Sequence, residues 1–72
     1  DRGMLAEAYR ILKKKGKALI VDWADSFGGL GPHPRDVITE QTAKHMLEET
    51  GFIVERRFSA GDHHYGIIAQ KP

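Results

Sequence analysis

The feature that most constrains this chain is the segment Ala18-Leu19-Ile20-Val21, which is apolar at every position. A strand with one face in water alternates apolar and polar residues, whereas a strand covered on both faces is apolar throughout. We therefore predict a strand from Lys17 to Trp23 that is covered on both of its faces. It is the longest apolar run in the chain and falls far below the roughly 20 residues that span a membrane.

The chain has 72 residues and no cysteine, so disulfides and thiolate zinc sites are excluded. One domain at most fits this length, and a domain of this size is marginally stable. The 11 Lys and Arg nearly balance the 10 Asp and Glu, which argues against electrostatic capture of nucleic acid. No signal peptide is visible at the N-terminus. These features favour a cytoplasmic protein that binds neither nucleic acid nor membrane.

Two segments have helical spacing. Apolar residues recur every three to four positions from Met4 to Lys14, which predicts a helix. Its end is predicted by the last-turn cations Lys13-Lys14-Lys15 and by the Gly16 that follows them. A second helix is predicted from Glu40 to Thr50, with Thr39 as its N-cap and Gly51 as a left-handed C-terminal residue. Its expected buried residues are Ala43, Met46 and Leu47.

The C-terminal part predicts two strands, Phe52 to Ser59 and His63 to Gln70, joined in an antiparallel hairpin by the turn Ala60-Gly61-Asp62. A long loop from Ala24 to Arg35 precedes the second helix. The resulting order is helix, strand, loop, helix, strand, strand. It predicts an α/β fold whose sheet is mainly parallel, with one antiparallel member contributed by the hairpin.

Three blocks of sequence resemble class I S-adenosylmethionine-dependent methyltransferases. The segments 7–13 and 16–23 are similar to a late helix and the fifth strand of that family, and Leu47 to Phe52 is similar to the helix end before the sixth strand. His64 to Pro72 is similar to the closing seventh strand. The family's usual Lys-Pro-Gly-Gly before the fifth strand is Lys14-Lys15-Gly16 here, without proline. The resemblance covers residues 1–72 as a single partial domain and implies part of a three-layer, Rossmann-like sheet.

The same resemblance implies which part of the family's fold is present. Its methyl-donor site depends on a glycine-rich turn after the first strand and on an acidic residue that ends the second strand. Neither precedes Asp1, and the chain does not begin with Met. We therefore expect the C-terminal half of a methyltransferase, with S-adenosylmethionine bound by the intact protein and not by this chain alone. Gly28-Gly29-Leu30-Gly31 follows the wrong strand for a nucleotide loop and leads into proline.

Three residues are candidates for contact with a small-molecule methyl acceptor. Asp22 and Trp23 end the predicted strand, where open α/β sheets bind their ligands. Asp22 could accept a proton or orient the nucleophile, and Trp23 could line an apolar pocket. The alternative is that Trp23 is a core aromatic residue and Asp22 caps the next loop. His33, in the Gly-Pro loop, could polarise a substrate group.

The remaining chemistry-bearing residues predict no site. His63 and His64 are adjacent on a predicted strand, where neighbouring side chains point to opposite faces and do not chelate one ion together. The four histidines form no metal-ligand spacing, so no metal site is expected. The Lys13-Lys14-Lys15 cluster is interpreted as a solvated helix end.

Two hypotheses remain open. The first is that the parent protein transfers a methyl group from S-adenosylmethionine to a small molecule. The second is that the chain is a non-catalytic α/β interaction or oligomerisation module. Under either hypothesis the apolar strand lacks a neighbour on one side, because the other half of the sheet is missing. We therefore predict a homo-oligomer that shares the exposed sheet edge or a swapped element.

Overall fold

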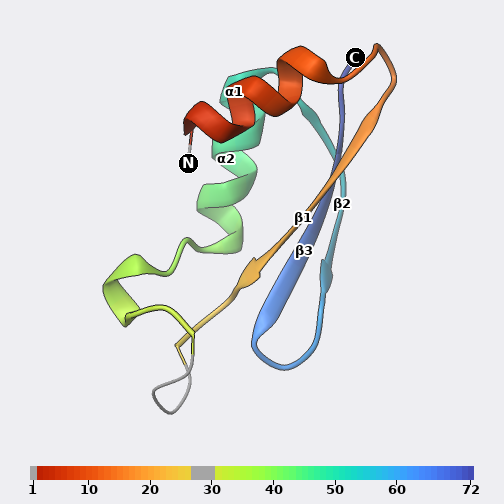
Figure 1. Cartoon of the computed structure of the whole chain (residues 1–72). Helices are drawn as coiled ribbons and strands as arrows, with labels where there is room; N and C mark the ends of the chain where they lie inside the picture. The colour runs from red at the N-terminus through yellow and green to blue at the C-terminus, as the bar shows by residue number, and fades with distance from the viewer. Residues whose placement is uncertain (1, 27–30) are drawn as a thin grey trace.

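The computed structural model of the chain describes residues 2–26 and 31–72. It contains two α-helices, three strands and a short 3-10 helix, η1 (Pro34–Asp36), in the order α1, β1, η1, α2, β2, β3 (Figure 1). The helices are α1 (Arg2–Ile11) and α2 (Glu40–Thr50). The strands are β1 (Lys17–Trp23), β2 (Ile53–Ser59) and β3 (His64–Gln70). The predicted α/β class, element order and C-terminal hairpin are confirmed.

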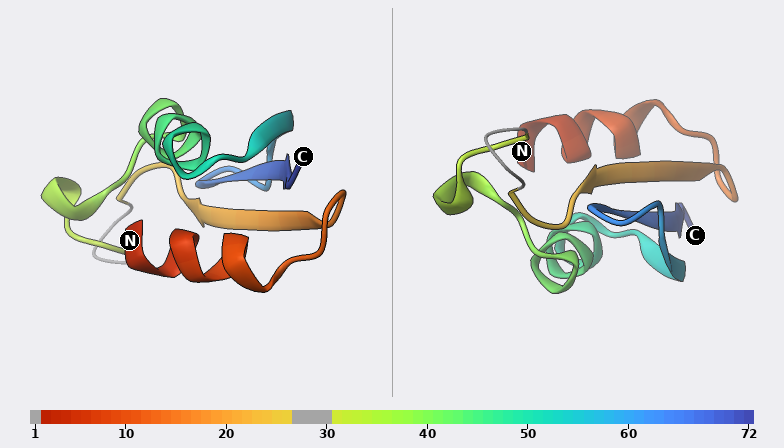
Figure 2. Two further views of the ribbon diagram at one scale, coloured as in Figure 1. Left: turned by 90° about the horizontal axis from the view of Figure 1, so that it is seen from above. Right: turned by 90° about the horizontal axis from the view of Figure 1, so that it is seen from below.

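The sheet has the order β1-β3-β2, so the last strand lies between the other two (Figure 2). Both neighbouring pairs are antiparallel, with Leu19 opposite Ile68 in one pair and Phe58 opposite Gly66 in the other. The expectation of a mainly parallel sheet is therefore wrong for the described residues. β1 and β2 run in the same direction, but β3 enters between them and turns both pairings antiparallel.

A one-residue bulge interrupts β2. Val54 lies opposite Ala69 and Arg56 lies opposite Ile68, so Glu55 is the additional residue on the β2 side. Bulges twist a strand and disrupt its ladder. Because β2 is an edge strand of this sheet, the bulge falls on one of its two borders.

The second helix matches its prediction in detail. The Thr39 hydroxyl accepts a hydrogen bond from the Thr42 amide at 3.1 Å, and Gly51 takes the left-handed conformation with φ of 116°. Phe52 then packs back on the helix, its amide donating to the Leu47 carbonyl at 3.0 Å. These contacts satisfy amide and carbonyl groups that helix ends otherwise leave unpaired.

The first helix ends earlier than predicted, at Ile11. Lys13, Lys14 and Lys15 therefore lie beyond its last turn, and Lys15 rather than Gly16 has the positive φ, at 70°. The Lys15 amide donates to the Lys71 carbonyl at 2.7 Å, and the Lys71 amide donates to the Gly16 carbonyl at 2.9 Å. Pairing with the C-terminal residues thus fixes a turn here, where local sequence favoured more helix.

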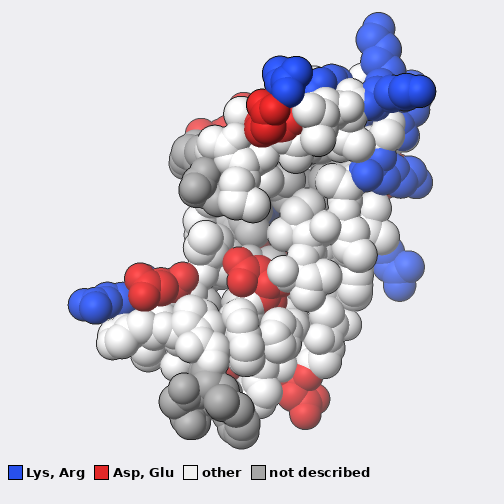
Figure 3. Space-filling view, viewed as in Figure 1, with Lys and Arg blue, Asp and Glu red and all other residues white. Residues whose placement is uncertain are grey.

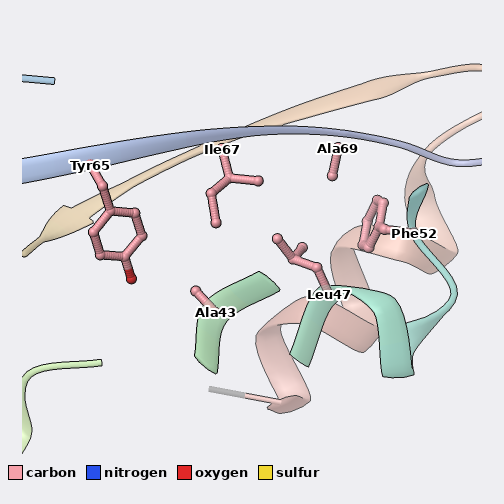
Figure 4. Close-up of a cluster of buried hydrophobic side chains, with 6 residues drawn as sticks. All are labelled: Ala43, Leu47, Phe52, Tyr65, Ile67 and Ala69. Atoms are coloured by element: carbon pink, nitrogen blue, oxygen red, sulfur yellow. The ribbon is translucent and has the colours of Figure 1, made fainter. Parts of the chain in front are cut away.

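The core lies between the helices and one face of the sheet. Tyr65, Ile67 and Ala69 point from β3 toward Ala43 and Leu47 of α2, with Phe52 at one end (Figure 4). From the α1 side, Leu5, Tyr9 and Leu12 pack against this cluster, and the rings of Tyr9 and Phe52 meet edge to face at 5.2 Å. Both helices therefore cover the same face, which we call the helix face.

The opposite face of the sheet, the open face, carries no helix among residues 2–26 and 31–72. Burial along β1 alternates: Ala18 and Ile20 pack on the core, whereas Leu19 and Val21 are 64% and 52% exposed. The expectation that both faces of this strand are covered is therefore wrong for the described chain. Its residues form two layers of the predicted three-layer arrangement.

Candidate functional site

A hollow of about 90 Å³ lies between the helices and the carboxyl end of β1. Its wall is mainly apolar, and Asp22 is the charged residue among those that line it. Its lining residues come from both helices, two strands and the segment before α2: Leu5, Ile20, Asp22, Ile38, Ala43, Met46, Leu47 and Tyr65.

Asp22 is half-buried in this wall. Its Oδ1 accepts a hydrogen bond from the backbone amide of Trp23 at 2.8 Å, which orients the carboxylate. A carboxylate has two oxygens and can accept several hydrogen bonds, so Asp22 can also accept one from a molecule in the hollow. A base in a mainly apolar wall is a suitable arrangement for taking a proton from a small nucleophile.

Tyr65 lies opposite Asp22 in the sheet and is not among the site residues predicted from the sequence. Its hydroxyl donates a hydrogen bond to the Ile38 carbonyl at 2.8 Å. Burial, and then the negative charges of Asp22 and Glu40, raise the pKa of Tyr65 to about 12. The phenol therefore stays neutral at physiological pH and holds the segment before α2 against the sheet. Only the strand register, which pairs Asp22 with Tyr65, could have identified this neighbour.

Trp23 lies on the other face. Its ring stacks on His64 with centroids 4.1 Å apart and a tilt of 41°. Gly31 also lies against it, since a side-chain carbon added there would come within 2.8 Å of the indole ring. The structure therefore separates Asp22 and Trp23: the first faces the hollow, and the second packs between the loop and β3 on the open face.

His33 precedes the short helix η1 as its N-cap. Its Nδ1 accepts a hydrogen bond from the Arg35 amide at 3.3 Å, and its side chain is exposed. It is not among the residues that line the hollow. Gly28, Gly29 and Leu30, from the glycine-containing stretch considered above, lie outside the described residues. The three predicted acceptor-site residues thus do not meet in one site in the part of the chain that is described.

The other histidines have separate surroundings. His63 Nδ1 lies 2.9 Å from Asp25 Oδ1, whereas His64 stacks on Trp23. Among the described residues, no group of three or more His, Cys, Asp or Glu side chains is placed to hold a metal ion. Neither described helix is long and apolar enough to cross a membrane.

Two solved structures are similar to this chain. One is a SAM dependent methyltransferase from Aquifex aeolicus, with a TM-score of 0.85, 28% identity, and a match covering 99% of this chain and 38% of that one. The other is a putative type 11 methyltransferase from Sulfolobus solfataricus, with a TM-score of 0.79, 28% identity, and coverage of 97% and 40%. This chain has a methyltransferase fold. It spans about 40% of the length of these methyltransferases.

The resemblance inferred from the three sequence blocks is therefore confirmed by overall structure. No family model matches the sequence, and no curated protein matches it. The similarity is thus carried by the arrangement of helices and strands, together with 28% identity over the matched region. That arrangement places Asp22 at the carboxyl end of β1, where open α/β sheets bind their ligands.

Proposed function

We propose that this chain is the acceptor side of a SAM-dependent methyltransferase that modifies a small molecule. The main support for this proposal is the structural match to two methyltransferases, which covers nearly the whole of this chain and about 40% of each of those chains. The Asp22 hollow supports the second part of the proposal. It is a small, mainly apolar recess with one carboxylate, which suits part of a small molecule better than a polymer.

The role proposed for Asp22 follows from the chemistry of methylation. A neutral O–H or N–H nucleophile that gains a methyl group must lose a proton, and a nearby carboxylate can accept it. The apolar walls would hold the acceptor in position and keep water away from it. Trp23 and His33 belong to this proposal only as surfaces near the loop, because neither lines the hollow.

We also propose that the methyl donor binds outside these 72 residues. A donor site of the expected kind needs a glycine-rich turn that leads directly from a strand into a helix. Here the glycine stretch continues through Pro32 into the short η1, and α2 starts only at Glu40. This order differs from that of the expected donor turn, which supports a donor site outside these 72 residues.

A hybrid protein tests this function. The chain would replace the matched 38% of the Aquifex aeolicus methyltransferase. We expect the hybrid to bind S-adenosylmethionine about as tightly as the parent does in calorimetric titration, and a variant with the matched segment deleted to lose binding. A hybrid that folds by circular dichroism but does not bind would contradict the proposal. Saturable binding by the 72-residue chain alone would contradict the placement of the donor site.

A second candidate is a non-catalytic interaction module, favoured by the exposure of Leu19 and Val21. Turnover separates the two functions. The hybrid would be incubated with amines, phenols and carboxylic acids, and S-adenosylhomocysteine release measured. Release that depends on the added acceptor supports the transferase. Tight donor binding with no release for any acceptor class favours the module.

A further inference from the structure

The polar side chains of the Asp22 hollow accept hydrogen bonds and do not donate them. Among the described residues that line it, these side chains are Asp22 and Tyr65. An ionised carboxylate has no hydrogen to donate. The Tyr65 hydroxyl gives its hydrogen to the Ile38 carbonyl at 2.8 Å, so its oxygen is an acceptor toward any other group. A molecule that binds these side chains must therefore supply the donors.

Asp22 differs from the neighbouring acids because it has no basic partner in the described part of the chain. Its carboxylate accepts a hydrogen bond from a backbone amide and forms no ion pair there. Asp25, in contrast, lies 2.9 Å from His63. Glu40 lies 3.7 Å from the Arg57 guanidinium. A half-buried carboxylate without a cation carries an uncompensated desolvation cost, which a cationic ligand would offset.

The largest group of cations lies at the other end of β1. Lys and Arg side chains gather mainly where α1 ends and β1 begins (Figure 3). Lys17 begins the strand, and Asp22 lies five residues further along it, about 17 Å away at about 3.4 Å per residue. Exposed charges are largely screened beyond a Debye length of about 8 Å. The basic group therefore does little to repel a cation that approaches Asp22.

The size of the hollow limits the ligand further. Its volume is about 90 Å³, whereas an apolar cavity that holds benzene measures about 150 Å³. An aromatic ring is therefore too large for it. A polar group on a short alkyl chain fits better, because the carbons can contact Leu5, Ile20 and Met46 while the polar group reaches Asp22.

We propose that the Asp22 hollow binds the ammonium group of a small aliphatic amine, and that this amine is the methyl acceptor. The second half of this inference rests on the proposed function. An ammonium group has three N–H donors for the Asp22 carboxylate and the Tyr65 oxygen, and its bonds to a carboxylate are charge-assisted. An alcohol offers one donor and no charge, and a carboxylate ligand brings a like charge to Asp22.

Asp22 also prepares the amine for reaction. A protonated amine has no free electron pair, so its nitrogen cannot attack until it loses a proton. That proton passes to a carboxylate oxygen of Asp22, where an O–H bond forms, and the electron pair of the broken N–H bond stays on nitrogen. Burial of an ammonium group in an apolar recess favours its neutral form. One carboxylate thus both binds the amine and takes its proton.

Titrations followed by amide NMR spectra test the selectivity with propylammonium, 1-propanol and propionate, which share a three-carbon skeleton. We expect propylammonium to shift the amides of Asp22, Ala43 and Tyr65 until the hollow is saturated. Propanol should bind about tenfold more weakly, because charge-assisted hydrogen bonds are about twice as strong as neutral ones, and propionate should not bind. Equal or tighter binding of propanol or propionate would overturn the proposal, as would the absence of a saturable shift with propylammonium.

Asp22→Asn tests the role of the charge. The asparagine side chain has the same size and keeps an oxygen that can accept from the Trp23 amide, so the fold should be retained. We expect this variant to bind propylammonium at least about tenfold more weakly and 1-propanol as before. The matched control Asp36→Asn removes the same charge from an exposed position in η1 and should change neither affinity. Undiminished ammonium binding by Asp22→Asn, or an equal loss in both variants, would overturn the proposal.

Turnover by the hybrid protein distinguishes failure of this inference from failure of the proposed function. A hybrid that binds S-adenosylmethionine would be given short aliphatic amines, phenol or propionate, and S-adenosylhomocysteine release measured. We expect release with the amines, and about 100-fold slower release in Asp22→Asn. Release with phenol or propionate but not with amines would overturn the amine assignment and leave the transferase standing. A hybrid that does not bind the donor would contradict the proposed function, while the NMR titrations still decide which ligand the hollow binds.

Discussion

Lys71 closes the helix that contains Tyr9. Its ammonium donates a hydrogen bond to the Tyr9 carbonyl at 2.7 Å and lies 4.6 Å from the centre of the Tyr9 ring. It donates a second hydrogen bond to the Leu12 carbonyl at 2.9 Å. A cation at a helix C-terminus opposes the helix dipole. The last residues of the chain thus stabilise its first helix.

Replacing Lys71 with alanine should therefore destabilise the chain by about 1–3 kcal/mol, because two charge-assisted hydrogen bonds are lost. Lys14→Ala is the control, since Lys14 is exposed and should change stability by less than about 0.5 kcal/mol. Urea unfolding monitored by circular dichroism measures both variants. If Lys71→Ala and Lys14→Ala change stability equally, Lys71 acts only through its positive charge and not through its two hydrogen bonds.

Gly66→Ala should destabilise the sheet by about 1–3 kcal/mol through overpacking. A side-chain carbon at position 66 would overlap the ring of Phe58, which lies directly opposite on β2. In a Phe58→Ala background the same substitution should cost much less, because the overlapping ring is gone. A double-mutant cycle from urea unfolding gives the coupling. A cost that is the same in both backgrounds would show that the ring is not the cause.

The Tyr65 phenol should make stability fall at high pH. Its pKa is raised from 10.0 to about 12 in the folded chain, by burial first and then by Asp22 and Glu40. Between these two values the folded state holds the proton that the unfolded state has released. The raised pKa of Tyr65 therefore adds to the free energy of unfolding in full below pH 10, and this contribution is lost as pH rises toward 12.

Unfolding midpoints measured across this pH range check the prediction, and Tyr65→Phe is the control. The phenylalanine variant should lose about 1 kcal/mol at neutral pH with the hydrogen bond to Ile38, and its midpoint should fall less steeply above pH 10. If the unfolding midpoint of Tyr65→Phe falls as steeply above pH 10 as that of the native chain, groups other than Tyr65 cause the loss of stability.

Asp22→Leu should stabilise the chain by about 1 kcal/mol if Asp22 serves a ligand and not the fold. Leucine would extend the apolar wall of the hollow, and a polar group in such a wall carries a desolvation cost. The same variant should lower the pKa of Tyr65, because the Asp22 charge contributes to its rise. Thermal unfolding and ultraviolet titration measure the two effects. Clear destabilisation would indicate instead that Asp22 caps the loop.

Elements with strong local signals could be predicted from sequence. Thr39 and Gly51 bound α2 where capping chemistry predicts, and β1 spans Lys17–Trp23 as its apolar run indicates. The end of α1 could not be predicted, because the turn after Ile11 is fixed by Lys71, about 60 residues away along the chain. Local propensity carries no information on such a contact.

The candidate site shows the same limit. The end of the first strand was correctly located, but its two residues were expected to act together. Alternation along the strand sends Asp22 to the helix face and Trp23 to the open face. The pairing of Asp22 with Tyr65 depends on the register of a strand more than 40 positions later, which no local pattern specifies.

The bulge in β2 protects one border of the sheet against other strands. There the extra residue Glu55 breaks the regular ladder, and Arg56 and Arg57 add charge. A further strand finds no flat, uncharged template on such a border. Growth of the sheet by strand addition therefore stops at β2.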